Sequence, residues 1–239
     1  MMKLATSVLA RRSLVVAVSM VTVAVAVVGA VALGSSAAHA GTFLALASDR
    51  DALALVNVVV TLKPVGRAAP ATTAQEIVVT QENATFKPYI SVIRVGSSVV
   101  FANRDNMEHH IKSFSSSKPF EIAVHKPGDT PPPIRFDKEG AVVAYCILHD
   151  WMRAYIYVAD TPWFAITGQP SGIARIENVP AGDYEATAWH PDLGQYKPPL
   201  VQQVTVGTTG VSEATFKFDF KARAIRQAPK GFGSSGKTG

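Results

Sequence analysis

Short apolar or alternating runs, each followed by turn residues, fill this chain from residue 41 to residue 220. The runs at residues 58–62 and 153–158 are rich in β-branched and aromatic residues, which favour strands. No long stretch between residues 41 and 220 repeats with helical period. The pattern predicts an all-β protein, and a chain of roughly 200 residues after the N-terminal segment can hold two small β-sandwiches.

The only cysteine, Cys146, begins a short stretch that continues with His149 and Met152 at three-residue steps. A thiolate, an imidazole and a thioether are three of the four ligands of a blue-copper site. The runs at residues 141–145 and 153–158 predict strands on both sides, so the stretch is expected to be a loop that joins them. We therefore predict one type-1 copper ion, with Cys146 and His149 as equatorial ligands and Met152 as the axial ligand.

This stretch has three alternative interpretations. A lone cysteine is often a small buried apolar residue, and the three side chains could form one face of a helix. The expected flanking strands argue against the helix. Zinc is a further alternative, but zinc takes cysteine, histidine and carboxylate ligands and seldom a thioether. Copper is therefore the favoured ion.

The second histidine ligand is expected upstream, where His109 and His110 are adjacent. Side chains alternate along a strand, so His109 shares a face with Ile111, and His110 shares the other face with Lys112. The apolar partner marks the inward face and favours His109 as the ligand. Glu108 could also offer an oxygen, but a solvated side chain is the favoured interpretation.

These residues together resemble the cupredoxin family, in particular its plastocyanin/amicyanin branch and exported copper proteins of the methylamine-utilisation type. The loop from Cys146 to Met152 is similar to that of amicyanin, and the segment Phe101-x-Asn103-x-Asp105-x-x-x-His109 is similar to the family's first half. The match covers residues 74–159. The resemblance implies a Greek-key β-sandwich, selects His109 as the ligand, and implies that His149 is exposed and passes electrons to partners.

Two positions depart from that family pattern. His110 stands where asparagine is usual, and Asp150 stands where proline is common. A carboxylate beside His149 would favour its imidazolium form when copper is reduced. We therefore expect a reduction potential that depends on pH.

The character of the chain changes after Asp160. Residues 160–220 resemble the second half of a carboxypeptidase-regulatory-like (transthyretin-like) β-sandwich, and residues 41–66 resemble its first half. The hypothesis is a second, smaller sandwich that is discontinuous in sequence, with the cupredoxin domain inserted into it. The alternative is two domains in tandem, with residues 41–66 contributing their strands to the cupredoxin.

The N-terminal residues 1–40 have the pattern of a signal peptide: a basic start, an apolar stretch at residues 13–33 and Ala38-His39-Ala40 before a cleavage site. Arg11-Arg12 also resembles a twin-arginine signal. We expect a periplasmic or exported protein cleaved after Ala40. An uncleaved membrane anchor is the alternative, and it is the only membrane association expected. A single cysteine cannot pair within the chain, and a bound metal would protect it in an oxidising compartment.

The formal charge of +5 gives a misleading picture of the folded body. Three basic residues lie in the signal segment and five in the tail, residues 221–239, and neither segment has an acid. The body between them is weakly acidic, so no nucleic-acid partner is expected. The tail is expected to be disordered.

The preferred function is one-electron transfer between redox partners by a protein that is not an enzyme. The partner is expected to be a cytochrome, a dehydrogenase or an oxidase. The main alternative is a periplasmic copper-binding or copper-delivery protein, and an adhesion or carbohydrate-binding role for the second sandwich is another. Multicopper enzymes need extra histidines, and only five follow residue 40. Of these, His125 is expected to be exposed, and His190 is expected to pack or form a turn.

Overall fold

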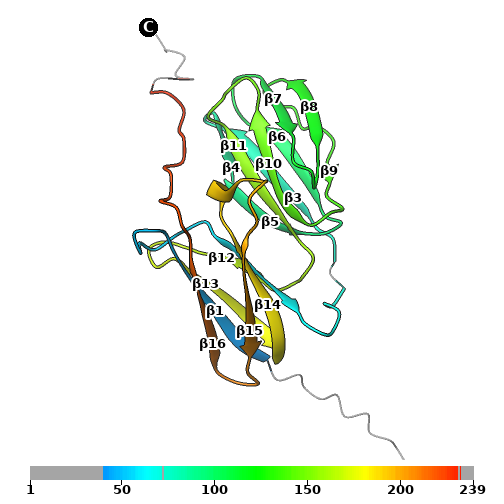
Figure 1. Ribbon diagram of the computed structural model, residues 1–239. Helices are drawn as coiled ribbons and strands as arrows, with labels where there is room; N and C mark the ends of the chain where they lie inside the picture. The colour runs from blue at the N-terminus through cyan, green and yellow to red at the C-terminus, as the bar shows by residue number, and fades with distance from the viewer. Residues whose placement is uncertain (1–39, 72, 231, 233–239) are drawn as a thin grey trace, which may run out of the picture. The chain divides into compact units, whose positions relative to one another are not determined.

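The computed structural model describes residues 40–71, 73–230 and 232. The predicted signal peptide therefore lies outside the described residues except for Ala40. Strands make up nearly all of the regular structure that is described, together with one short 3-10 helix (Figure 1). Within these same ranges, no helix is long and apolar enough to cross a membrane. The protein is all-β, as the sequence predicts.

Residues 76–159 form one sandwich, which we call the contiguous sandwich. Its strands are β3 (Glu76–Glu82), β4 (Thr85–Lys87), β5 (Ile90–Arg94), β6 (Ser98–Asn103), β7 (His109–Ser113), β8 (Phe120–His125), β9 (Ile134–Arg135), β10 (Gly140–Cys146) and β11 (Arg153–Ala159). One sheet has the order β5-β11-β10-β7-β8, and the other has the order β4-β3-β6-β9. The β5–β11 and β3–β6 pairs are parallel, and the other pairs are antiparallel.

The core of the contiguous sandwich lies between these two sheets. Phe101 on one sheet and Ile111, Val142 and Ile156 on the other are buried in the same cluster. Strand β7 shows why these side chains meet in the core. Its residues alternate between buried and partly exposed positions, so one face of the strand points inward. Cys146 and Met152 belong to the same cluster, so the ligand loop begins and ends in the core.

The remaining strands form a second sandwich, which we call the split sandwich because its strands come from both ends of the described chain. They are β1 (Ala40–Ser48), β2 (Val59–Pro64), β12 (Phe164–Ile166), β13 (Ile173–Pro180), β14 (Gly182–Trp189), β15 (Leu200–Val206) and β16 (Val211–Lys217), with the 3-10 helix η1 (Pro191–Leu193) after β14. The two sheets have the orders β13-β1-β16 and β12-β2-β14-β15.

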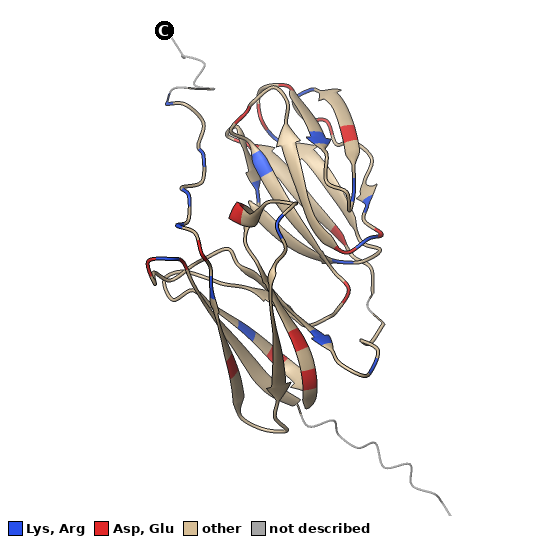
Figure 2. Ribbon diagram, in the orientation of Figure 1, with Lys and Arg blue, Asp and Glu red and all other residues tan. Residues whose placement is uncertain are grey.

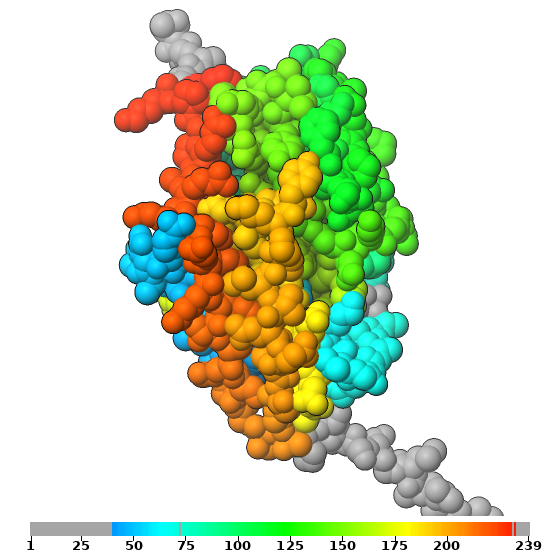
Figure 3. All heavy atoms as spheres, viewed as in Figure 1, coloured from blue at the N-terminus to red at the C-terminus, as the bar shows by residue number. Residues whose placement is uncertain are grey.

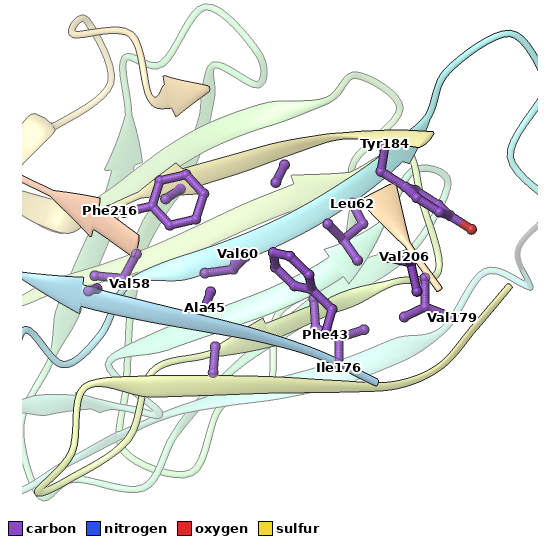
Figure 4. Close-up of a cluster of buried hydrophobic side chains, with 14 of the residues drawn as sticks. Phe43, Ala45, Val58, Val60, Leu62, Ile176, Val179, Tyr184, Val206 and Phe216 are labelled. Carbon is purple, nitrogen blue, oxygen red and sulfur yellow. The ribbon is translucent and has the colours of Figure 1, made fainter. Parts of the chain in front are cut away.

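The core of the split sandwich is filled from both of its sheets. Phe43, Leu62, Ile176, Tyr184 and Phe216 are buried there in one cluster, which Figure 4 shows between the strands. Phe43 and Phe216 come from adjacent strands of one sheet, and Leu62 and Tyr184 come from adjacent strands of the other. Since each sheet has its apolar face inward, neither sheet could be stable alone in water.

Strand β2 pairs with strands from the second half of the chain. Val59 and Val60 pair with Ile166 and Ala165 on one side, and Val60 also pairs with Ala188 on the other. The tandem alternative requires these residues in the sheets of residues 74–159. The structure instead places residues 40–64 and 164–217 in the same two sheets.

After β16 the chain continues as an extended segment, which we call the C-terminal segment (residues 221–230 and 232). It has no regular structure in its described part, and Figure 1 draws it as a long trace beside the sandwiches. Residues 221–230 contain four basic residues and no acid, which Figure 2 shows as blue positions only. In the space-filling view of Figure 3 this segment lies along the surface of the body.

Candidate metal centre

Three potential metal ligands lie close together in the contiguous sandwich. Two are at the ends of neighbouring strands, and the third is in a loop. His109 is the first residue of β7, and Cys146 is the last residue of β10, which pairs with β7. His149 lies in the loop that joins β10 to β11. Backbone hydrogen bonds close this loop: Cys146 N–H donates to Met152 O at 3.2 Å, and Met152 N–H donates to His149 O at 2.9 Å. The loop is therefore held in one shape by the sheet on both sides.

The three side chains meet with their donor atoms facing one another. Cys146 Sγ lies 3.5 Å from His109 Nδ1 and 3.4 Å from His149 Nδ1, and the two Nδ1 atoms are 3.2 Å apart. A point equidistant from the three atoms in their plane lies about 2 Å from each, close to the bond lengths of nitrogen and sulfur to zinc-sized metals. All three residues are buried. The cluster has the dimensions of a three-coordinate plane around one ion.

The protonation of His109 is fixed by Asp105. His109 Nε2 lies 2.8 Å from Asp105 Oδ2, and a carboxylate can only accept, so Nε2 carries the proton. The lone pair on Nδ1 then faces Cys146 and His149. Burial lowers the pKa of both His109 and His149, which favours the neutral imidazole that a metal needs. Carboxylate–histidine–metal arrangements of this kind orient the ligand ring.

Asp105 is itself held by a turn from another part of the chain. Its carboxylate accepts the Ala84 N–H, at 3.0 Å to Oδ2, and the Ala84 carbonyl accepts the Trp151 Nε1–H at 2.9 Å. Ala84 has φ of 51°, in the left-handed region that side chains with a Cβ seldom adopt. These two hydrogen bonds link the ligand loop to Asp105 through a single residue, Ala84. The sequence analysis did not predict this role for Asp105 or Ala84.

The donor set fits copper in both oxidation states. A thiol and two neutral imidazoles converge, and Met152 is almost fully buried in the same cluster as Cys146. Soft sulfur ligands suit Cu(I), imidazole suits both oxidation states, and a thioether is unusual for zinc. His109, Cys146 and His149 are therefore the residues that would hold a copper ion, and Met152 stays the predicted fourth ligand.

The two other upstream candidates lie outside the cluster. His110 turns to the other face of β7, where its Nε2 lies 2.7 Å from the Glu121 carboxylate. Glu108 is exposed, in keeping with a solvated side chain. His109 therefore lies on the buried face of β7, as the alternation predicts, and His110 contacts the Glu121 carboxylate at the surface.

The expectation that His149 is exposed is wrong, because aromatic side chains cover the ligand loop. His149 is only 8% exposed, and the ring of Phe232 lies 5.2 Å from its ring and 4.7 Å from that of Trp151. The Asp150 carboxylate accepts a hydrogen bond from the Arg226 guanidinium at 2.8 Å. The positive charge of Arg226 offsets the negative charge of Asp150 beside His149. This weakens the reason to expect a reduction potential that depends on pH. The sequence carries no local signal that residues so far downstream reach this loop.

The expectation that His125 is exposed is wrong. Its side chain is 6% exposed, and its Nε2 lies 2.8 Å from the Gln81 amide oxygen. Strand β3 of the opposite sheet supplies Gln81 from 44 positions upstream, which local sequence cannot reveal. His190 is buried where η1 begins, and its Nδ1 accepts the Asp192 N–H at 3.0 Å. It forms a turn, as expected.

No protein-family model matches the chain, and a search of curated proteins found no match. Solved structures with partial similarity include the copper-containing nitrite reductase of Thermus scotoductus SA-01, at 26% identity and a TM-score of 0.34. That match covers 41% of this chain and only 25% of the reductase. A purple cupredoxin from Nitrosopumilus maritimus matches at 25% identity and a TM-score of 0.31, over 36% of this chain and 100% of its own. An amicyanin variant in the Cu(I) form matches at 20% identity and a TM-score of 0.33, over 35% of this chain and 82% of its own.

Proposed function

We propose that this protein is a copper-containing electron carrier that works outside the cytoplasm. The observation that carries the proposal is the buried cluster of one thiol and two imidazoles within 3.5 Å of one another. When bound, a copper ion there would supply a one-electron Cu(I)/Cu(II) couple. The predicted signal peptide, with cleavage after Ala40, supports export.

The protein residues contribute ligands that do not need to move. Cys146 and His109 are fixed by paired strands, and the loop that carries His149 is closed by backbone hydrogen bonds. Asp105 keeps the proton of His109 on Nε2, away from the cluster. A rigid set of ligands that suits both oxidation states lowers the rearrangement that accompanies each electron transfer, and this favours a carrier over an enzyme.

The surface beside the ligand loop supports transient docking of a redox protein. Ile147 and Leu148, next to His149 in the loop, are about half exposed. Electron-transfer encounters are small and short-lived, so a modest apolar patch is enough. A cytochrome, a dehydrogenase or an oxidase is the proposed partner class. A copper-delivery role would need an open site that releases its ion readily, and the burial of all three ligands disfavours it.

Voltammetry of the copper-loaded protein tests this proposal. We expect a reversible one-electron wave with one copper ion per chain, because the ligands suit both oxidation states. The Glu108→Gln variant, changed beside His109 but outside the cluster, should give the same wave. An irreversible response, or loss of copper on reduction, would reject the carrier and favour a delivery protein.

A further inference from the structure

A cavity of about 320 Å³ lies against the ligand loop, apart from the three donor atoms. One wall is the contiguous sandwich, with the rings of Phe86, Tyr89, Trp151 and Tyr155. The opposite wall is part of the C-terminal segment, residues 223–227. Its volume lies in the range of small-molecule sites, which are typically lined by aromatic side chains and a few polar groups.

The aromatic wall is fixed before any ligand arrives. The rings of Tyr89 and Tyr155 pack edge to face with their centroids 5.2 Å apart. The Trp151 indole is held by its hydrogen bond to the Ala84 carbonyl. Burial raises the pKa of Tyr89, so its hydroxyl stays protonated and can donate a hydrogen bond. These rings form a preorganised surface for a planar apolar group.

The charges around the cavity favour an anion. Four lining residues are basic, and Asp192 is the only acidic one. Lys87, Arg223 and Arg226 have acidic partners in Glu82, Asp192 and Asp150, respectively.

Arg153 is the lining cation that remains unpaired. Among the residues that the structure describes, it has no carboxylate partner, and its Nε is buried without a hydrogen-bond acceptor. Its guanidinium lies 5.4 Å from the centroid of the Tyr145 ring, a contact that leaves N–H groups available at its edge. A guanidinium at the wall of the cavity that has no carboxylate partner favours an anion there.

We propose that this cavity binds a small aromatic carboxylate, with its ring among the aromatic side chains and its carboxylate on Arg153. A planar carboxylate matches the fork of N–H donors on a guanidinium. The aromatic wall supplies the apolar contact, and the Tyr89 hydroxyl supplies a further donor. The site belongs to the protein itself and does not depend on a bound metal.

Calorimetric titration of the purified metal-free protein with benzoate tests the proposal. Benzamide has the same shape without the charge, and acetate has the charge without the ring. We expect saturable one-to-one binding of benzoate, and binding of benzamide and acetate at least about tenfold weaker, since each loses one of the two contacts. The absence of copper separates this result from the test of electron transfer.

Two substitutions locate the site. Arg153→Gln should weaken benzoate binding by at least about tenfold, whereas Arg175→Gln, which changes an exposed arginine on β13, should not. Tyr89→Phe removes only a hydroxyl and should weaken benzoate binding by a smaller factor. It tests the same site independently if the Arg153 variant does not fold. No saturable binding up to about 10 mM benzoate, equal binding of benzamide, or unchanged binding in both the Arg153 and Tyr89 variants would overturn the proposal.

Discussion

Asp105 provides a sharp test of how the protein prepares His109 for a metal. Its side chain is 5% exposed, and its Oδ2 accepts both the His109 Nε2–H at 2.8 Å and the Ala84 N–H at 3.0 Å. Asp105→Asn can place its amide oxygen at the same position and accept both bonds, so it removes the charge alone. Asp105→Ala removes the charge and both acceptors.

The two substitutions should therefore have graded effects on copper affinity. Removing a residue that orients a metal-bound histidine weakens binding by about 10- to 100-fold. We expect Asp105→Asn near the lower limit, a loss of about 1.4 kcal/mol, and Asp105→Ala near the upper limit, a loss of about 2.8 kcal/mol. The difference arises because only the alanine variant leaves the His109 Nε2–H without a partner.

Competition with a chromophoric Cu(I) chelator measures these affinities. Glu108→Gln is the matched control, because it removes an exposed carboxylate that is next to His109 in the sequence. It should bind copper as the unmodified protein does. The reasoning is refuted if Asp105→Ala retains the affinity of the unmodified protein within about twofold, or if Glu108→Gln loses as much as the Asp105 variants.

Three further predictions concern the rest of the chain. Burial lowers the pKa of His190 to about 4, against 6.5 ordinarily, so below pH 6.5 the unfolded chain gains a proton that the folded chain does not. Stability should be full above that pH and fall by about 3 kcal/mol toward pH 4 in urea unfolding, and His190→Asn should flatten this slope. Phe216→Ala should destabilise the protein by about 3–5 kcal/mol in the same assay, because the ring is fully buried, whereas Val211→Ala on the exposed surface should cost less than about 0.5 kcal/mol. Phe232→Ala should increase acrylamide quenching of Trp151 fluorescence, because its ring covers that indole, and should change stability by less than about 1 kcal/mol; unchanged quenching would contradict the contact.

Local patterns in the sequence predict much of this fold. Strand alternation places His109 and Ile111 on one face of β7, and both side chains are buried. The apolar runs on both sides of Cys146 become β10 and β11, so the loop between them falls where the sequence predicts. These predictions succeed because burial on one face of a strand follows directly from a two-residue period.

Contacts between distant segments could not be predicted in this way. Gln81 satisfies His125 from another sheet, and Phe232 reaches His149 from the end of the chain. The link from Ala84 to Asp105 depends on a left-handed turn at Ala84, and an alanine in the sequence does not indicate such a turn. In each case the partner is chosen by tertiary packing, and the sequence on either side of the residue contains no periodic signal for it.

Visible absorption of the purified protein on addition of one equivalent of Cu(II) tests the central claim most directly. The buried Cys146 thiol lies within 3.5 Å of both histidine nitrogens, so a bound copper ion would have a thiolate ligand. We predict an intense thiolate-to-copper charge-transfer band that saturates at one ion per chain and is absent in Cys146→Ser. A colourless protein, or a band that survives in Cys146→Ser, would contradict the account.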